Sequence, residues 1–401
     1  MTTPRRVTIM GSTGSIGCSA LSVIDHANSG TDLHFEIDAL VAGSDVEALA
    51  DQALKHRPSL AVIADESKLE ALRERLRGSN IGCAAGQTAV LEAAARPCDR
   101  VLGAIVGAAG LPSTLAAVHA GNSVALANKE SIVSGGPMLL KAAAERNVSI
   151  LPVDSEHNAI FQVFLDRKSV ESLTITASGG PFRELTLEAM RHVSPEQARA
   201  HPVWDMGIKN SIDSASLMNK ALEFIEAAYL FDMPEDRIDV LVHPQSIVHG
   251  MAHYKDRSVL AQLGVPDMRT PIANALCWPD RVETPVERLN LAEIGALTFE
   301  AVDSRRFPAI DLARAAIRAG KGAPTALNSA NESAVTAFIG GMCGFLDISS
   351  IVEGTLDWYV GSAFALGEPM SLEELLVIDR EARRKAGELV NACAASNGVA
   401  S

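Results

Sequence analysis

Residues 6–17 of the chain read RVTIMGSTGSIG. A short β-branched run ends here in Gly11, Gly14 and Gly17, and a helical pattern follows over residues 16–26. Glycines at a strand-to-helix turn let the backbone approach a pyrophosphate, whose charge the helix N-terminus favours. The G-x-x-G-x-x-G spacing is a variant of the usual dinucleotide fingerprint. We therefore predict a nucleotide-binding turn in preference to a tight turn that merely needs small residues.

Strand and helix patterns alternate from this turn to about residue 150. Apolar runs predict strands at 7–10, 35–41, 60–64, 101–106 and 124–127. Helical patterns lie between them, for example at 46–55. Such alternation predicts a parallel sheet covered by helices. The first domain is therefore expected to be α/β, with a Rossmann-like nucleotide-binding fold over residues 1–150.

An apolar run at residues 148–153 leads directly into Asp154-Ser155-Glu156. The run is typical of a buried strand, and ligands of open α/β sheets bind outside the carboxyl ends of the strands. Two carboxylates at one strand end repel each other unless a cation or a proton lies between them. A hard divalent cation, which takes oxygen ligands, is the favoured interpretation. Taken alone, the acids could also be solvated loop residues or a helix N-cap.

The regular alternation of strand and helix patterns ends in residues 151–290. Strands are predicted at 173–177, 241–242 and 258–263, a helix at 214–228, and a long polar segment at 181–207. In the helix, Asn219 and Glu223 share one face, and Lys220 neighbours Glu223. Glu223 could supply a third carboxylate to a metal site, although Lys220 and Glu223 alone would suggest a surface salt bridge. This region is predicted to be an α+β catalytic and dimerisation domain.

The remainder of the chain is predicted to be helical. After a linker at 291–310, helical patterns run through residues 311–318, 324–339, 347–360 and 372–394. They predict a C-terminal α-helical bundle over residues 311–401.

Composition limits the class of protein. The chain has 401 residues, 47% of them hydrophobic, and a net charge of −14, which argues against a nucleic-acid partner. No apolar run is long enough to span a bilayer, so no membrane partner is expected. Six cysteines without C-x-x-C spacing argue against a disulfide framework and a zinc site. The N-terminus runs straight into a strand, so no targeting segment is apparent and a cytoplasmic location is expected.

Together these segments resemble the 1-deoxy-D-xylulose 5-phosphate reductoisomerase family. Seven separated motifs carry the resemblance in order along nearly the whole chain: GSTGSIG (11–17), ANKES (127–131), PVDSEHN (152–158), SGGPF (178–182), MNKALE (218–223), HPQS (243–246) and PDMRTP (266–271). The resemblance implies a homodimeric enzyme that uses NADPH and a divalent cation, Mg²⁺ or Mn²⁺, with Co²⁺ as a further candidate. Its reaction rearranges and reduces 1-deoxy-D-xylulose 5-phosphate, a sugar phosphate, to 2-C-methyl-D-erythritol 4-phosphate.

The resemblance also implies roles for individual residues. The implied metal ligands are Asp154, Glu156 and Glu223, which with Lys129 form the implied catalytic set. The implied cofactor-binding residues are Gly11, Thr13, Gly14, Ser15, Ile16, Gly17, Gly43, Asn128, Glu130 and Gly207. The implied substrate-binding residues are Lys129, Ser155, Glu156, Ser178, His201, Ser214, Asn219, Lys220 and Glu223. Residues 181–207, around Trp204 and Met206, are implied to form a mobile lid.

One departure from the family affects the cofactor. Ser44-Asp45 follows Gly43 where several family members carry a basic residue, and an acid there suits a free ribose hydroxyl better than a 2′-phosphate. Two alternatives stay open. One is a simple NAD(P)-dependent dehydrogenase of amino-acid metabolism, and the other is a non-catalytic nucleotide sensor. Neither alternative needs a three-carboxylate metal site.

Overall fold

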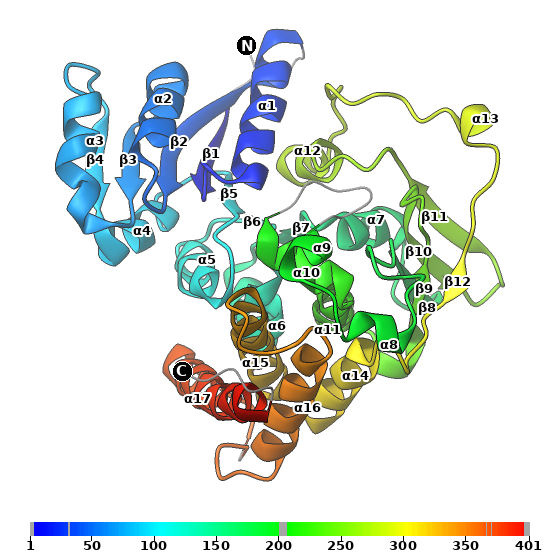
Figure 1. Cartoon of the computed structure of the whole chain (residues 1–401). Coiled ribbons are helices and arrows are strands. Elements are labelled where there is room, and N and C mark those ends of the chain that lie inside the picture. The colour runs from blue at the N-terminus through cyan, green and yellow to red at the C-terminus, as the bar shows by residue number, and fades with distance from the viewer. Residues whose placement is uncertain (1–3, 31–32, 200–206, 366, 370, 397–401) are drawn as a thin grey trace. The chain divides into compact units, whose positions relative to one another are not determined.

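The computed structural model describes residues 4–30, 33–199, 207–365, 367–369 and 371–396 (Figure 1). The chain forms two compact units that alternate along the sequence. The first comprises Met1–Ser131, Leu139–Asn158 and Asp267–Arg288, and the second comprises Ile132–Met138, Ala159–Pro266 and Leu289–Ser401. The boundaries at residues 150, 290 and 310 stay a prediction.

The first unit contains a seven-stranded sheet in the order β4-β3-β2-β1-β5-β6-β7. Its strands are β1 (Arg5–Met10), β2 (Phe35–Ala42), β3 (Leu60–Ile63), β4 (Gly82–Ala85), β5 (Arg100–Gly103), β6 (Val124–Leu126) and β7 (Ile150–Pro152). Every neighbouring pair is parallel, which confirms the predicted sheet. The direction of strand addition reverses between β1 and β5, and ligands of such sheets bind at this kind of switch point.

The first unit also contains helices, most of which connect its strands. They are α1 (Ser15–Gly30), α2 (Val46–His56), α3 (Leu69–Arg75), α4 (Gly86–Ala94), α5 (Leu111–His119), α6 (Lys129–Arg146), α7 (Ser155–Val163) and α12 (Arg269–Cys277), the sixth and seventh of which extend into the second unit. Val7 and Ile9 on one face of the central strand β1, and Thr8 and Met10 on the other, are at most 1% exposed, as expected for a sheet covered on both faces.

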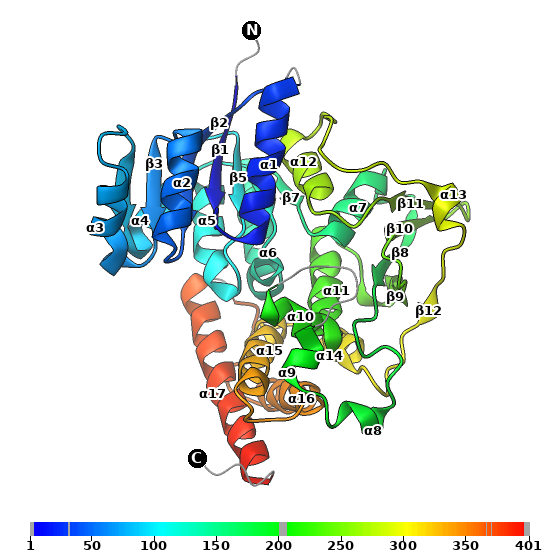
Figure 2. The same ribbon diagram turned by 45° about the horizontal axis from the view of Figure 1, so that its top comes forward.

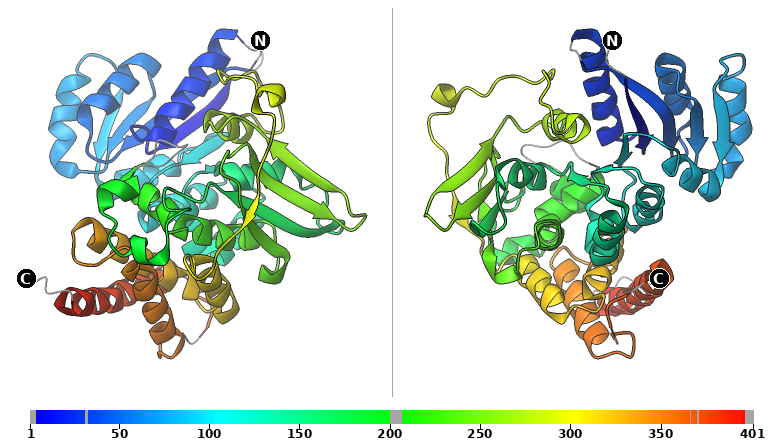
Figure 3. Two further views of the ribbon diagram at one scale, coloured as in Figure 1. Left: turned by 45° about the vertical axis from the view of Figure 1, so that its right-hand side comes forward. Right: turned by 180° about the vertical axis from the view of Figure 1, so that it is seen from behind.

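The second unit contains a mixed five-stranded sheet in the order β11-β10-β8-β9-β12 (Figure 3). Its strands are β8 (Val170–Ala177), β9 (Ile238–Val242), β10 (Val248–Tyr254), β11 (Val259–Leu263) and β12 (Glu300–Ala301). Strands β8 and β9 are parallel, and the other pairs are antiparallel. Strand β11 is therefore an edge strand of this sheet, paired within the sheet only with β10.

Helices make up the rest of the second unit (Figure 2). They are α8 (Leu187–Met190), α9 (Pro195–Arg199), α10 (Ile208–Ala215), α11 (Met218–Leu230), α13 (Leu291–Ile294), α14 (Ala309–Ala319), α15 (Ala323–Ile339), α16 (Asp347–Val360) and α17 (Leu372–Ser396). The last four confirm the predicted helical bundle. None of the helices in the described part of the chain combines the length and apolarity needed to cross a membrane.

The prediction of one helix over 214–228 is wrong in detail. Two helices, α10 and α11, meet at Leu217, whose φ of 58° places it in the left-handed region. A left-handed residue cannot continue a right-handed helix, so the chain turns a corner there.

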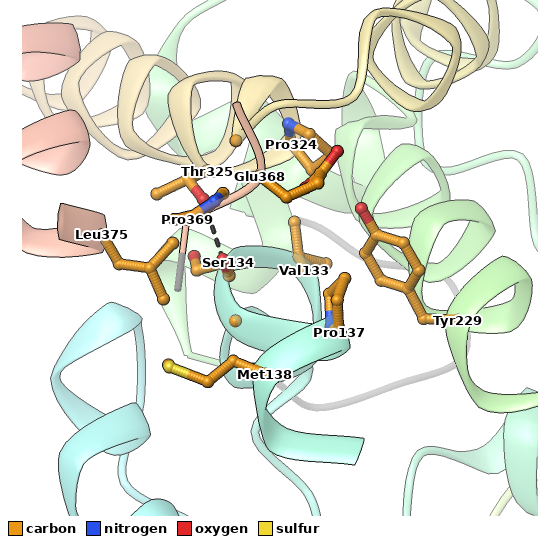
Figure 4. Close-up of a pocket in the computed structure, with 12 residues that line it drawn as sticks. Val133, Ser134, Pro137, Met138, Tyr229, Pro324, Thr325, Glu368, Pro369 and Leu375 are labelled. Atoms are coloured by element: carbon orange, nitrogen blue, oxygen red, sulfur yellow. Dashed lines mark hydrogen bonds between the residues drawn. The ribbon is translucent and has the colours of Figure 1, made fainter. Parts of the chain in front are cut away.

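Helix α6 is kinked at Gly135, where φ and ψ are −127° and 19°. Pro137 lacks an N–H and clashes with the preceding turn, which accounts for the kink. Within the second unit, Thr325 Oγ1 donates a hydrogen bond to the Ser134 carbonyl at 2.8 Å (Figure 4). This bond ties the kinked turn of α6 to α15.

Candidate active site

The glycine turn after β1 is built by two of its three glycines. Gly11 has a φ of +91°, and a side chain there would lie 2.6 Å from the Ala104 carbonyl oxygen. A side chain at Gly17 would lie 2.4 Å from the carbonyl oxygens of Gly11 and Ser12. Gly14 is exposed, and a side chain there would meet only the Gly11 oxygen, at 3.5 Å. The fold therefore requires Gly11 and Gly17 but leaves the space at Gly14 open.

Asp45 has a local structural role at the end of β2. Its Oδ1 accepts a hydrogen bond from the Ala48 amide at 3.0 Å, so the side chain caps the start of α2. Gly43 is exposed beside it. This capping role gives a structural reason for an acid at position 45 that does not depend on the ribose of the cofactor.

Asn128 shapes the loop at the carboxyl end of β6. Its Oδ1 accepts from the Ser131 amide at 2.8 Å and so caps α6, while its Nδ2 donates to the Gly107 carbonyl at 3.0 Å and to Glu130 at 3.1 Å. Asn128 and Glu130 are both buried. This cap fixes Lys129 as the first residue of α6, at the same edge of the sheet as the glycine turn.

Asp154 lies at the carboxyl end of β7 and is paired on both oxygens. Lys129 Nζ is 2.5 Å from its Oδ2, and His157 Nδ1 is 3.0 Å from its Oδ1. Burial alone would raise the pKa of Asp154, but the Lys129 ammonium and His157 hold it well below its usual value. Asp154 is therefore a buried carboxylate kept ionised, which excludes the solvated-loop interpretation. No role was expected for His157, although it stands on α7 three positions after Asp154, a spacing that brings helical neighbours together.

Ser155 and Glu156 open α7 directly after Asp154. The Ser155 hydroxyl donates a hydrogen bond to the Glu156 carboxylate. Both side chains are partly exposed. The first unit thus delivers two carboxylates, Asp154 and Glu156, to one strand end, as the sequence indicated.

Glu223 belongs to a buried polar cluster on α11 in the second unit. The Lys220 ammonium contacts its carboxylate, and Asn219 Nδ2 donates to its Oε1 at 2.5 Å. Lys220 is 3% exposed and Glu223 is 1% exposed. The cluster is therefore not a surface salt bridge, because both charges are removed from solvent.

Ser178 and Ser214 lie on two segments of the second unit that pack together. The Ser178 hydroxyl accepts a hydrogen bond from the Gly180 amide at 3.3 Å. A side chain at Gly180 would lie 2.8 Å from the Ser214 carbonyl oxygen, so the SGGPF loop rests directly on the end of α10. Gly207 occupies the N-cap position of α10.

Part of the predicted lid cannot be described. His201, Trp204 and Met206 lie outside the described residues, whereas residues 181–199 contain the short helices α8 and α9. The mobility of residues 181–207 stays a prediction.

Three family models match this chain. They are 1-deoxy-D-xylulose 5-phosphate reductoisomerase over residues 7–136, its C-terminal domain over 150–231, and the DXP reductoisomerase C-terminal domain over 263–385. A 1-deoxy-D-xylulose 5-phosphate reductoisomerase of Caulobacter vibrioides is 52% identical over 97% of this chain and 98% of its own length. The chain belongs to the 1-deoxy-D-xylulose 5-phosphate reductoisomerase family. The resemblance found from the motifs is confirmed.

Solved structures of this family have the same fold. The reductoisomerase from Zymomonas mobilis in complex with NADPH is 48% identical, with a TM-score of 0.90 over 97% of this chain and 99% of that chain. A reductoisomerase in complex with NADPH, fosmidomycin and magnesium is 40% identical, with a TM-score of 0.89 over 96% of this chain and 98% of that chain. The two alternatives, a simple dehydrogenase and a nucleotide sensor, are not favoured by these relationships.

The site residues expected for a reductoisomerase are divided between the two units. The first unit holds the glycine turn, Gly43, Asn128, Lys129, Glu130, Asp154, Ser155 and Glu156, and the second holds Ser178, Gly207, Ser214, Asn219, Lys220 and Glu223.

A small cavity in the second unit is separate from these groups. Its lining includes Ser134, Tyr229, Thr325 and Glu368 (Figure 4). Of the expected site residues in the described part of the chain, none lines this cavity.

Proposed function

We propose that the protein converts 1-deoxy-D-xylulose 5-phosphate to 2-C-methyl-D-erythritol 4-phosphate, a step of isoprenoid precursor synthesis. The carbon skeleton rearranges first, and NADPH then reduces the resulting aldehyde. The observation that carries the proposal is the 52% identity to a named reductoisomerase along essentially the whole of both chains. The local geometry of the acid and lysine side chains supports it.

Asp154, Glu156 and Glu223 would hold the divalent cation. Carboxylate oxygens are the ligands that Mg²⁺ and Mn²⁺ prefer, so the donor set fits the group. Lys129 and His157 keep Asp154 ionised, and an ionised carboxylate is the form that binds metal. A bound cation polarises a ketone oxygen and orients a neighbouring one. A relative has been solved with magnesium.

The glycine turn would bind NADPH. Gly14 is exposed and uncrowded, and α1 begins at Ser15, so backbone N–H groups at the helix N-terminus face the open space. Thr13, Ser15 and Ile16 complete the phosphate-binding set, with Gly43, Asn128, Glu130 and Gly207 as further cofactor residues. NADPH supplies the hydride.

The substrate would be held by hydrogen-bond donors. Lys129 Nζ carries protons beside Asp154 and donates to a substrate oxygen. The phosphate is held by hydroxyl, amide and ammonium donors, a set suited to an anion. We assign Ser178, His201, Ser214, Asn219 and Lys220 to this set. Residues 181–207 would close over the substrate and exclude water from the aldehyde.

We propose a homodimer that acts in the bacterial cytoplasm. Val259 and Leu260 on the edge strand β11 are 47% and 39% exposed, and an apolar strand edge is suited to burial against a second copy. The six cysteines, all in the described part of the chain, are not paired in disulfides, which suits a reducing compartment. Named relatives come from bacteria such as Caulobacter vibrioides and Zymomonas mobilis.

The direct test is NADPH oxidation on addition of 1-deoxy-D-xylulose 5-phosphate and Mg²⁺. Oxidation should stop when a chelator is added and resume with excess Mg²⁺. The product should be 2-C-methyl-D-erythritol 4-phosphate by mass and NMR spectrum. A chelator-resistant reaction, or simple reduction of the ketose without rearrangement, would overturn the proposal and favour a simple dehydrogenase.

A further inference from the structure

Asp213 is a buried carboxylate in α10 to which the proposed chemistry gives no role. Its side chain is only 1% exposed. Asn331 Nδ2, on α15, donates to its Oδ1 at 2.9 Å, and Lys209 Nζ lies 2.9 Å from its Oδ2. All three residues belong to the second unit. A buried charge is tolerated only where it is paired, so these contacts fix Asp213 and tie α10 to α15.

Asp213 lies in the last turn of α10, four residues before Leu217, where α10 and α11 meet. The Ser216 hydroxyl donates to the Asp213 carbonyl at 3.3 Å, and the Leu217 amide donates to the Ser214 carbonyl at 3.2 Å. These bonds close the last turn of α10 before α11 begins at Met218. Three proposed phosphate-binding residues follow within seven positions: Ser214, Asn219 and Lys220. A displacement of Asp213 would therefore move all three together.

The SGGPF loop also packs closely against the corner between α10 and α11. Gly180 has a φ of +66°, and a side chain there would lie 2.8 Å from the Ser214 carbonyl oxygen and 3.0 Å from Ala215 Cα. The corner is thus held between the SGGPF loop and α15. The bond between Asn331 and Asp213 ties α10 to α15 just before this corner.

Asn331 carries a buried polar atom that does not contribute to the stability of the fold. The residue is fully buried, and its Oδ1 makes no hydrogen bond to any residue in the described part of the chain. An unsatisfied buried acceptor destabilises a fold. Local rules of this kind are broken most often at functional sites.

We propose that Asp213, held by Asn331, is a positioning residue for the substrate phosphate. It acts through Ser214, Asn219 and Lys220 and touches no reacting atom. The inference rests on the proposed function for the identity of the substrate, but the phosphate subsite itself can be tested without turnover.

The test compares Asp213→Asn and Asn331→Leu with the wild type and with Ser333→Ala. Ser333 is a matched control on the same helix, because its hydroxyl donates to the Ser329 carbonyl within α15, at 2.8 Å. We expect Asp213→Asn to raise KM for 1-deoxy-D-xylulose 5-phosphate roughly 10- to 100-fold, the range of a misplacement of about 1 Å, while kcat changes much less. Calorimetry with inorganic phosphate should reveal the same loss of affinity. NADPH affinity should change much less, because the glycine turn belongs to the other unit and Gly207 is the only proposed cofactor residue in this one.

A rescue separates positioning from simple stabilisation. The double variant D213N/N331D restores an amide–carboxylate pair between the two helices and should recover phosphate affinity relative to D213N. Where D213N does not fold, Asn331→Leu carries the same measurements. A lower Tm with unchanged KM and unchanged phosphate affinity would overturn the proposal. If the wild type bound phosphate but did not convert the ketose, the proposed function would fail while the phosphate titration still decided this inference.

Discussion

Gly14→Ala should separate nucleotide binding from folding, with Gly17→Ala as its matched control. A Cβ at Gly14 would lie 3.5 Å from the Gly11 carbonyl oxygen, which is ordinary van der Waals contact. A Cβ at Gly17 would lie 2.4 Å from two carbonyl oxygens and 2.5 Å from Ser12 Cα. The same methyl group is therefore accommodated at one glycine and excluded at the other.

The expected magnitudes differ accordingly. Gly17→Ala forces backbone to move, and overpacking of this kind costs about 1–3 kcal/mol of the free energy of unfolding. Gly14→Ala should change that free energy by no more than about 0.5–1 kcal/mol, in either direction. Its methyl group would instead occupy the space proposed for the pyrophosphate. Loss of one hydrogen bond to a charged group, about 1.5–3 kcal/mol, corresponds to roughly a 10- to 150-fold rise in the NADPH Kd.

The measurements are fluorescence titration with NADPH and thermal unfolding of both variants. Gly14→Ala should keep the wild-type Tm and lose affinity, whereas Gly17→Ala should lose Tm. Wild-type affinity for NADPH in a folded Gly14→Ala variant would refute the placement of the pyrophosphate at this turn.

Four further outcomes are expected. Glu223→Ala should nearly abolish turnover at limiting Mg²⁺, and full activity in a steady-state assay would exclude it as a metal ligand. Light scattering at micromolar concentration should give a dimer, and a monomer would contradict the role proposed for the β11 edge. Hydrogen exchange across residues 181–207 should slow when a phosphate-bearing, metal-chelating ligand binds, and equal protection in both states would exclude a lid. Burial opposes ionisation of Asp38, but Arg96 and Arg6 outweigh it and lower its pKa. The ionised Asp38 carboxylate therefore stabilises the fold above its ordinary pKa of about 3.9, and this stabilisation is lost as pH falls through the lowered pKa. The free energy of unfolding in urea should therefore differ less between the wild type and Asp38→Asn as the pH falls below about 4.

The sequence predicted the sheet of the first unit well because its central strands are β-branched and apolar. It missed β4, Gly82–Ala85, whose residues read GCAA and have little β-propensity. That strand exists because β3 offers a free edge to which it pairs in parallel. The two-residue strand β12 is likewise defined only by pairing with β9. Strands of this kind depend on tertiary partners and leave no local signal.

The residues of the candidate site likewise differ in whether a local sequence signal predicts them. The carboxylates at the end of β7 could be predicted, because a strand end has a local signature and parallel strands share an edge. The pairing of Asp213 with Asn331 could not, since 118 positions separate two residues that each resemble an ordinary helix residue. The break at Leu217 was also missed, because a leucine gives no sign of the left-handed conformation it adopts.

The charged side chains that helix α11 buries indicate what kind of ligand the candidate site binds. A surface helix keeps its charges on the solvent side, whereas α11 buries Lys220, Glu223 and Glu226 with at most 3% of each residue exposed. Replacing a buried ion pair by apolar residues of similar volume is often neutral or stabilising, so folding alone does not require these charges. A cation that binds Glu223 and a phosphate that binds Lys220 would each supply the opposite charge to one member of the pair. The burial of these side chains therefore supports the proposal that α11 binds a ligand with both a metal-binding and an anionic end, such as a sugar phosphate.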